Sequence, residues 1–115
     1  METKIYHNSR CSKSREALSL LKRKTEDIEI IDYLKKTLSY SEIVDILSYL
    51  KLEPIEIIRK QEEVWKRKFK DKNMSNKEII TAITNHPKIM ERPIIIKNKK
   101  AVIGRPPDKV LTLFS

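Results

Sequence analysis

Hydrophobic and polar positions divide the chain into two ends that predict strands and a middle that predicts helices. Residues 3–7 read as a strand, and residues 12–24 place apolar side chains along one side of a helix. Residues 28–33 read as a second strand. A strand, a helix and a strand of these lengths predict a βαβ unit with parallel strands and a right-handed crossover.

The middle of the chain is expected to be a helical insertion covering approximately residues 39–88. Residues 39–42 and 75–78 have the Ser-x-x-Glu pattern of a capping box, and apolar residues follow each with helical spacing. Pro54 is suited to the first turn of a short helix. Residues 62–70 predict another helical segment, and a histidine–proline pair ends the last helix of the insertion.

The last part of the chain predicts a hairpin followed by a helix. Residues 94–96 and 101–103 are apolar runs separated by a polar connection, which favours two antiparallel strands. Residues 106–114 begin with a proline pair and continue with helical spacing, so that Val110, Leu111 and Phe114 are expected on the helix. We therefore expect residues 1–115 to form one α/β domain, with βαβ and ββα halves around the insertion.

Composition limits the kinds of partner and site. The formal charge of +9 favours anionic partners, but the basic clusters lack interleaved aromatic residues, so no nucleic-acid binding is expected. The single cysteine excludes an internal disulfide and a cysteine-based zinc site, and His7 and His86 lie too far apart to suggest metal ligands. With no signal-like segment or long apolar run, we expect a cytoplasmic protein without a membrane span.

The only cysteine, Cys11, lies where the first strand meets the first helix. Bringing a thiol pKa from about 8.5 to a mostly ionised state at neutral pH takes about 2.7 kcal/mol. A helix N-terminus supplies up to about 2 kcal/mol, so nearby positive charge must contribute. His7, Arg10, Lys13 and Arg15 are candidates, and the turn therefore predicts a nucleophilic thiolate.

The order of elements, with a cysteine at the first strand–helix turn, is typical of a thioredoxin-like domain. Residues 7–15, His-Asn-Ser-Arg-Cys-Ser-Lys-Ser-Arg, resemble the His-Asn-Pro-x-Cys-x-x-Ser-Arg signature of the glutathione/glutaredoxin-coupled arsenate reductases, the ArsC family. Three further segments match in the family's order: Ile-Ile-Arg-Lys at 57–60, Glu-Arg-Pro-Ile at 91–94 and Ile-Gly-Arg-Pro at 103–106.

The resemblance implies Cys11 as the catalytic residue and Arg59, Arg92 and Arg105 as the ligands of a tetrahedral oxyanion. Arginines suit this role because their planar donor forks stay charged throughout a reaction. Backbone N–H groups at the start of the first helix would face the same anion.

Three supporting residues also follow from the resemblance. His7 would tune the thiol, Ser14 would donate a hydrogen bond to it, and Pro93 would be the cis-proline beside it. The sequence departs from the signature at Ser9, where the family usually has proline, and at Ser12, where glycine is common.

The resemblance further implies that arsenate, or a similar oxyanion, is reduced to arsenite. Cys11 would attack arsenic(V), glutathione would attack the resulting covalent adduct, and glutaredoxin would resolve the mixed disulfide. The chain has no second cysteine to act as an internal reductant. Glutathione is thus expected as a co-substrate, with no bound cofactor.

Two other functions remain open from the sequence. One is a different glutathione-linked thiol oxidoreductase, because Ser9 and Ser12 alter the turn around the thiol. The other is a non-enzymatic redox or transcription regulator resembling the Spx-type proteins, for which the positive charge would suit an acidic partner. The usual Cys-x-x-Cys switch of those regulators is absent, since Ser14 occupies its second position.

Overall fold

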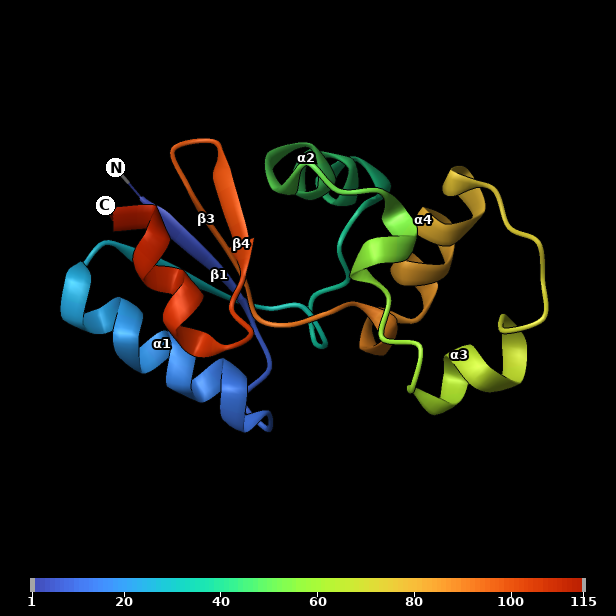
Figure 1. Cartoon of the computed structure of the whole chain (residues 1–115), viewed down its shortest axis with the longest axis horizontal. Helices are drawn as coiled ribbons and strands as arrows, with labels where there is room; N and C mark the ends of the chain where they lie inside the picture. The colour runs from blue at the N-terminus through green and yellow to red at the C-terminus, as the bar shows by residue number, and fades with distance from the viewer. Residues whose placement is uncertain (1, 115) are drawn as a thin grey trace. The chain divides into compact units, whose positions relative to one another are not determined.

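The computed structural model describes residues 2–114 (Figure 1). The chain forms two compact units, one made of residues up to 36 and from 92 onward, the other of residues 37–91. The helical insertion expected at 39–88 corresponds to the second unit. That the two units behave as one domain stays a prediction.

A four-stranded mixed sheet is the centre of the first unit. Its order is β2-β1-β3-β4, with β1 parallel to β2 and antiparallel to β3, and β4 antiparallel to β3. The strands are β1 (Thr3–His7), β2 (Ile28–Asp32), β3 (Ile94–Lys97) and β4 (Lys100–Ile103). This arrangement confirms the predicted thioredoxin-like fold, including the parallel pair and the C-terminal hairpin.

The helices α1 (Ser12–Lys24) and η3 (Pro107–Phe114) lie side by side against one face of this sheet (Figure 1). Their common core consists of fully buried apolar side chains from the sheet and from both helices: Ile5, Ala17, Leu21, Ile95 and Val110. Full burial of a large aliphatic side chain contributes about 1.5–3 kcal/mol. This core therefore fixes the start of α1, where Cys11 lies, against the sheet.

The C-terminal helix forms where the sequence predicts it. It is a 3-10 helix throughout, and Leu111 is exposed on it. Because a 3-10 helix repeats every three residues, Val110 and Leu113 share one side of it and both pack on the core. Leu111 is turned away from that side.

The second unit is helical, as predicted. It contains α2 (Tyr40–Leu50), η1 (Pro54–Ile57), α3 (Glu63–Lys68), α4 (Asn76–Asn85) and η2 (Pro87–Ile89). Both capping boxes are formed, with Ser39 and Glu42, and Ser75 and Glu78, exchanging side-chain to backbone hydrogen bonds of 2.9 to 3.2 Å. These bonds explain why α2 and α4 begin where the sequence predicts.

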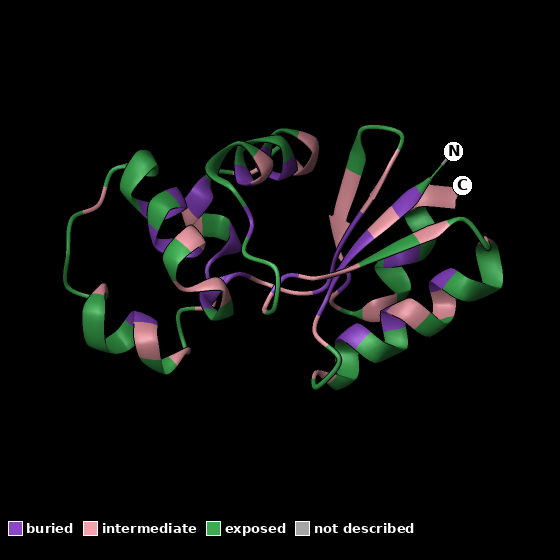
Figure 2. Cartoon of the chain, turned by 180° about the vertical axis from the view of Figure 1, so that it is seen from behind, coloured by how far each residue is buried: buried purple, intermediate pink, exposed green. Residues whose placement is uncertain are grey.

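Helices α2 and α4 bury isoleucine-rich faces (Figure 2). Ile43, Ile46 and Leu47 form the buried stripe of α2, whereas Val44, which also fits the apolar pattern, is 41% exposed. Val44 follows Ile43 by one residue and so points about 100° away around the helix. An apolar residue next to the stripe was therefore not sufficient to predict burial.

The only glycine serves close packing rather than a left-handed turn. Gly104 has no positive φ, while Lys51, Asn98 and Lys99 adopt positive φ angles without being glycine. A Cβ atom added at Gly104 would lie 2.9 Å from Cγ of Pro93. The chain thus passes close to Pro93 at the end of β4, immediately before Arg105.

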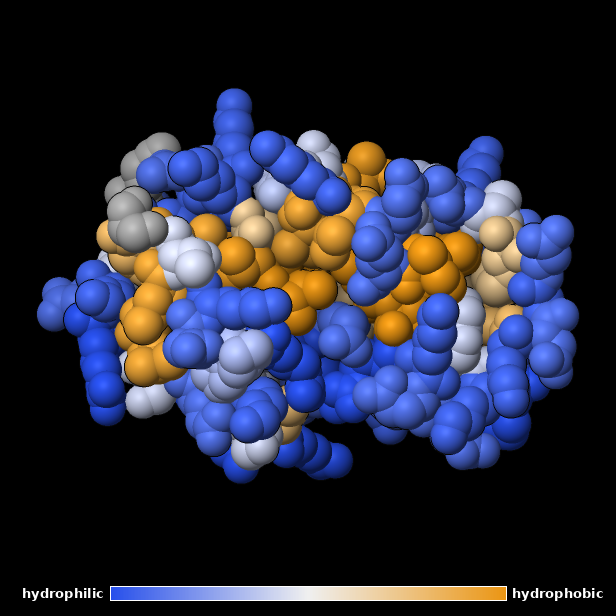
Figure 3. Space-filling view, viewed as in Figure 1, coloured by the Kyte–Doolittle hydropathy of each residue, from blue (hydrophilic) through white to orange (hydrophobic). Residues whose placement is uncertain are grey.

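Most of the surface in Figure 3 is hydrophilic, with apolar residues in patches. Large hydrophobic side chains exposed among residues 2–114 are Ile30, Tyr40, Val44 and Leu111. Within these residues, no helix has both the length and the apolar character required to cross a membrane.

Candidate active site

Cys11 is the N-cap residue of the 13-residue helix α1, and its thiol is free and partly exposed. The turn before it is closed by a hydrogen bond of 3.0 Å from the Cys11 N–H to the Asn8 carbonyl. The Asn8 side-chain oxygen also accepts a 3.0 Å hydrogen bond from the Arg10 N–H. An asparagine can close a turn in this way, so the turn forms with serine at position 9 in place of proline.

Two arginines act on the thiol. Arg105 Nη2 donates a hydrogen bond to Cys11 Sγ at 3.3 Å, and the Arg92 side chain also interacts with the sulfur. Burial raises the pKa of Cys11, but the N–H groups of Ser14 and Lys13 and the two arginines together outweigh it. The net effect lowers the Cys11 pKa, which favours the nucleophilic thiolate.

The β3–β4 hairpin brings these two arginines together. Ile94 and Ile103 are paired across the hairpin. Arg92 lies two residues before the start of β3, and Arg105 lies two residues after the end of β4. Arg105 Nε donates a 2.8 Å hydrogen bond to the Arg92 carbonyl. Antiparallel pairing therefore brings the two arginines together, and Arg105 also reaches the Cys11 thiol.

Arg92 has an unused donor. Its Nε atom is buried and has no hydrogen-bond partner among residues 2–114. A buried polar group without a partner is unfavourable unless a ligand supplies one. The Arg92–Pro93 peptide bond is cis, as the resemblance implied for Pro93.

His7 and Ser14 form a buried pair behind the cysteine turn. His7 Nδ1 and Ser14 Oγ are 2.6 Å apart, and Ser14 Oγ accepts a 3.0 Å hydrogen bond from the Asn8 N–H. Burial lowers the pKa of His7, and the charges of Arg15 and Lys22 lower it further, against an opposing effect of Asp32. His7 is accordingly favoured in its neutral form.

The position of the Ser14 hydroxyl differs from the expectation that it donates to the thiol. It contacts His7 and Asn8 instead, and it is the backbone N–H of Ser14 that lowers the pKa of Cys11. The reason is geometric: Ser14 is fully buried on the inner side of α1, whereas the thiol lies at the helix end. Ser14 therefore influences the thiol through the backbone.

Arg59 belongs to the second unit, where it follows η1. Its side chain is only 13% exposed and forms ion pairs with Glu62 and Glu91. Its Nε and Nη1 atoms are buried without hydrogen-bond partners within residues 2–114. Its participation in the site of Cys11 stays a prediction.

Some contributing residues were not identified from the sequence. Asn8 shapes the turn, and Glu62 and Glu91 accompany Arg59. Asn8 and Glu91 lie inside the segments that match the family, and this match was the only sequence signal that could have identified them. Among residues 2–114, no group of three or more His, Cys, Asp or Glu side chains is arranged to hold a metal ion.

A cysteine at a helix N-terminus, beside two arginines gathered by the β3–β4 hairpin, defines the class as a thioredoxin-like protein with a candidate thiol site. Comparison with known proteins agrees with this class. The model of the ArsC family matches residues 6–113. The chain therefore belongs to the ArsC family.

Individual relatives cover nearly the whole chain. A structure named arsenate reductase from Vibrio cholerae superposes with a TM-score of 0.93 at 38% identity, covering 98% of both chains. A Neisseria meningitidis protein named arsenate reductase is 40% identical over 111 residues, or 95% of each chain. The Escherichia coli protein YfgD, named as uncharacterized, is 41% identical over 114 residues, covering 97% of this chain and 96% of its own.

Proposed function

We propose that this protein reduces arsenate to arsenite, with glutathione as co-substrate and glutaredoxin as protein partner. Membership of the ArsC family and relatives named arsenate reductase support the substrate. The observation that carries the proposal is the 3.3 Å hydrogen bond from Arg105 Nη2 to Cys11 Sγ. This hydrogen bond places the proposed nucleophile, Cys11, next to an arginine that is suited to bind an oxyanion.

Arsenate would bind through the arginines and the start of α1. Arg92 Nε is a buried donor without a partner in the described part of the chain, and Arg105 already lies at the thiol. Arg59 completes the proposed set of oxyanion ligands. Their charge would stabilise the substrate and the negative charge that develops as the thiolate attacks.

In the first step, the Cys11 thiolate attacks arsenic(V) and a sulfur–arsenic bond forms. One arsenic–oxygen bond breaks, and the oxygen leaves as hydroxide, or as water after protonation. Arsenic keeps its +5 oxidation state. The lowered pKa of Cys11 favours this step because the thiolate is the attacking form.

In the second step, glutathione thiolate attacks the Cys11 sulfur of the adduct. A disulfide forms, the sulfur–arsenic bond breaks, and its electron pair remains on arsenic, which leaves as arsenite in the +3 state. Glutaredoxin then attacks the glutathione sulfur of the mixed disulfide and releases Cys11 as thiolate. A second glutathione regenerates glutaredoxin, so two glutathione molecules are oxidised for each arsenate reduced.

The supporting residues would act by holding the nucleophile. Neutral His7 and buried Ser14 fix the first turn of α1, whose N–H groups face the thiol. Pro93 lies between Arg92 and the start of β3 and packs close to Gly104. Because the reaction consumes reduced glutathione, the proposed location is the cytoplasm, where thiols are kept reduced.

The test is arsenate-dependent NADPH oxidation coupled through glutathione, glutathione reductase and glutaredoxin. We expect turnover by the wild type, none by Cys11→Ser, and a loss in Arg92→Ala. Arg23→Ala, an exposed substitution in the last turn of α1, is the control for the removal of a positive charge. Folded wild-type protein without arsenate dependence would refute the proposal and favour another glutathione-linked thiol activity.

A further inference from the structure

Two carboxylates lie near the Nε atom of the Arg59 guanidinium. Glu62 Oε2 is 3.8 Å and Glu91 Oε1 is 4.0 Å from Arg59 Nε. Both glutamate side chains are partly buried, with 25% and 23% of their surface exposed. These distances are too long for hydrogen bonds, so the carboxylates attract Arg59 without using its donors.

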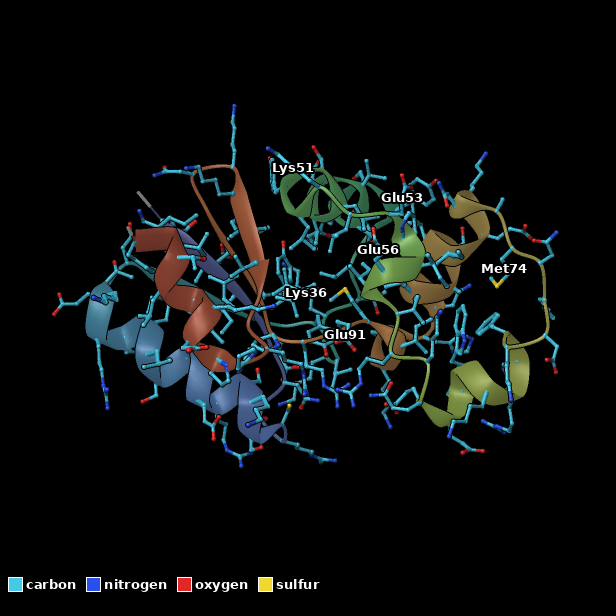
Figure 4. All side chains as sticks on the ribbon, in the orientation of Figure 1. Lys36, Lys51, Glu53, Glu56, Met74 and Glu91 are labelled. Carbon is cyan, nitrogen blue, oxygen red and sulfur yellow. The ribbon has the colours of Figure 1, made fainter. Side chains whose placement is uncertain are left out.

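The backbone sets Glu91 next to Arg59. Ile58 and Met90 form an isolated antiparallel bridge, flanked by two backbone hydrogen bonds of 2.7 Å. Both bridge residues are buried. Because neighbouring side chains in an extended segment point to opposite faces, Arg59 and Glu91 lie together on the other face. Glu91, labelled in Figure 4, thus occupies a diagonal cross-strand position.

Two donor atoms of the Arg59 guanidinium have no hydrogen-bond partner in the described part of the chain. Arg59 Nη1 is buried and forms no hydrogen bond with residues 2–114, and the same is true of Nε. A buried donor without a partner is unfavourable until an acceptor reaches it. The two carboxylates therefore hold Arg59 by charge at Nε, while its Nη1 donor remains unpaired within these residues.

We propose that Glu91, assisted by Glu62, is a positioning residue that fixes the direction of the Arg59 guanidinium, so that Arg59 can act as an oxyanion ligand. This inference rests on the proposed function, in which Arg59 is one of the oxyanion ligands. Neither glutamate touches the substrate. Their effect is to fix the direction of the guanidinium.

Whether Glu91→Gln weakens or strengthens oxyanion binding distinguishes a positioning role from a simple effect of net charge. Removing a negative charge close to an anion site would strengthen anion binding if only the net charge mattered. If the glutamates position Arg59, the same substitution weakens binding because the guanidinium loses its fixed direction. The two explanations therefore predict opposite results for Glu91→Gln.

The experiment measures how arsenate, and separately inorganic phosphate, protects Cys11 from alkylation by iodoacetamide. Positioning predicts that Glu91→Gln and Glu62→Gln each require roughly 3- to 10-fold more oxyanion for the same protection, the effect of one partly buried ion pair. Glu91→Asp should recover part of the loss. Asp45→Asn, an exposed carboxylate on α2, should protect like the wild type.

A second background tests whether the glutamates act through Arg59. In Arg59→Lys protein, adding Glu91→Gln should cause no further loss of protection. Equal losses in both backgrounds, or unchanged or stronger protection in the folded single variants, would overturn the inference. Circular dichroism establishes whether each variant is folded. If Glu91→Gln does not fold, Glu62→Gln provides an independent test.

Turnover distinguishes this inference from the proposed function. If both glutamine variants reduce arsenate at the wild-type rate and bind it with unaltered affinity, the positioning role is overturned but the proposed function stands. Absent arsenate turnover, together with weaker phosphate protection in those variants, would refute arsenate reduction and retain the positioning role for another oxyanion.

Discussion

Arg105 joins the thiol to the backbone of the neighbouring strand: its Nη2 donates to Cys11 Sγ at 3.3 Å, and its Nε donates to the Arg92 carbonyl at 2.8 Å. The second hydrogen bond fixes the direction of the first. The guanidinium therefore holds positive charge at the sulfur before any substrate binds. This preorganisation is what a nucleophilic thiolate requires.

Replacing Arg105 with alanine should raise the pKa of Cys11. The substitution removes a cation and a hydrogen-bond donor that favour the thiolate, whereas the burial that raises the Cys11 pKa remains. The pH dependence of iodoacetamide alkylation measures this change, because the midpoint of the rate profile reports thiolate formation. The midpoint should move to higher pH in Arg105→Ala and stay in place in Arg23→Ala; an unchanged midpoint in both would contradict this role.

His7 should make the protein less stable in mild acid. Burial and nearby cations lower the pKa of His7 in the folded state, so the unfolded chain binds a proton more readily. Stability contributed by neutral His7 is present above the unfolded pKa and is lost as the pH falls. Urea unfolding at about pH 8 and about pH 5.5 should show a larger loss in the wild type than in His7→Asn.

One outcome of the urea unfolding experiments would contradict this role of His7. An equal loss of unfolding free energy in His7→Asn and wild type would place the acid sensitivity elsewhere in the chain.

A methyl group at Gly104 should destabilise the first unit. The added Cβ would lie 2.9 Å from Pro93 Cγ and 3.3 Å from Ala17 Cβ, and overpacking of this kind costs about 1–3 kcal/mol. Alanine also restricts the unfolded chain, which offsets up to about 1 kcal/mol. Urea unfolding of Gly104→Ala should show a net loss, whereas exposed Ser19→Ala should change stability by at most about 0.5 kcal/mol. A stability gain in Gly104→Ala would show that the close approach is relaxed in solution.

Lys99→Gly should stabilise the β3–β4 hairpin. Asn98 and Lys99 both have positive φ angles, 53° and 61°, which a two-residue hairpin turn requires and which glycine adopts most readily. We expect a gain of up to about 1 kcal/mol, because relief of the lysine backbone is partly offset by the greater freedom of glycine in the unfolded chain. Thermal unfolding measures the change.

The neighbouring lysine gives the control for this prediction. Lys100 begins β4 and has no positive φ, so Lys100→Gly should lose about 0.5–1 kcal/mol. Equal losses in the two glycine variants would contradict the assigned turn.

Local sequence signals predicted the elements well where a short-range interaction fixes an end. The capping boxes at Ser39 and Ser75 set the starts of α2 and α4, and β1 and α1 have the predicted bounds. Burial was less predictable because it depends on distant segments. Val44 satisfies the helical pattern of α2 but lies outside its buried stripe.

The candidate site was predicted as a set of residues, not as a network. The matched segments indicated Cys11, Arg92 and Arg105, and the hairpin brings these three together. No local pattern could indicate that Arg105 also binds the Arg92 carbonyl or that the Ser14 hydroxyl contacts His7, because both depend on tertiary geometry. The ion pair between Arg59 and Glu91 likewise depends on a bridge between segments far apart in sequence.

The most direct test of the central claim is a single turnover with arsenate and glutathione in the absence of glutaredoxin. Mass spectrometry should find Cys11 converted to a mixed disulfide with glutathione, and one arsenite should be released for each modified protein. The reaction should require arsenate and be absent in Cys11→Ser. Arsenite formation without modification of Cys11, or glutathionylation at the same rate without arsenate, would contradict reduction through Cys11.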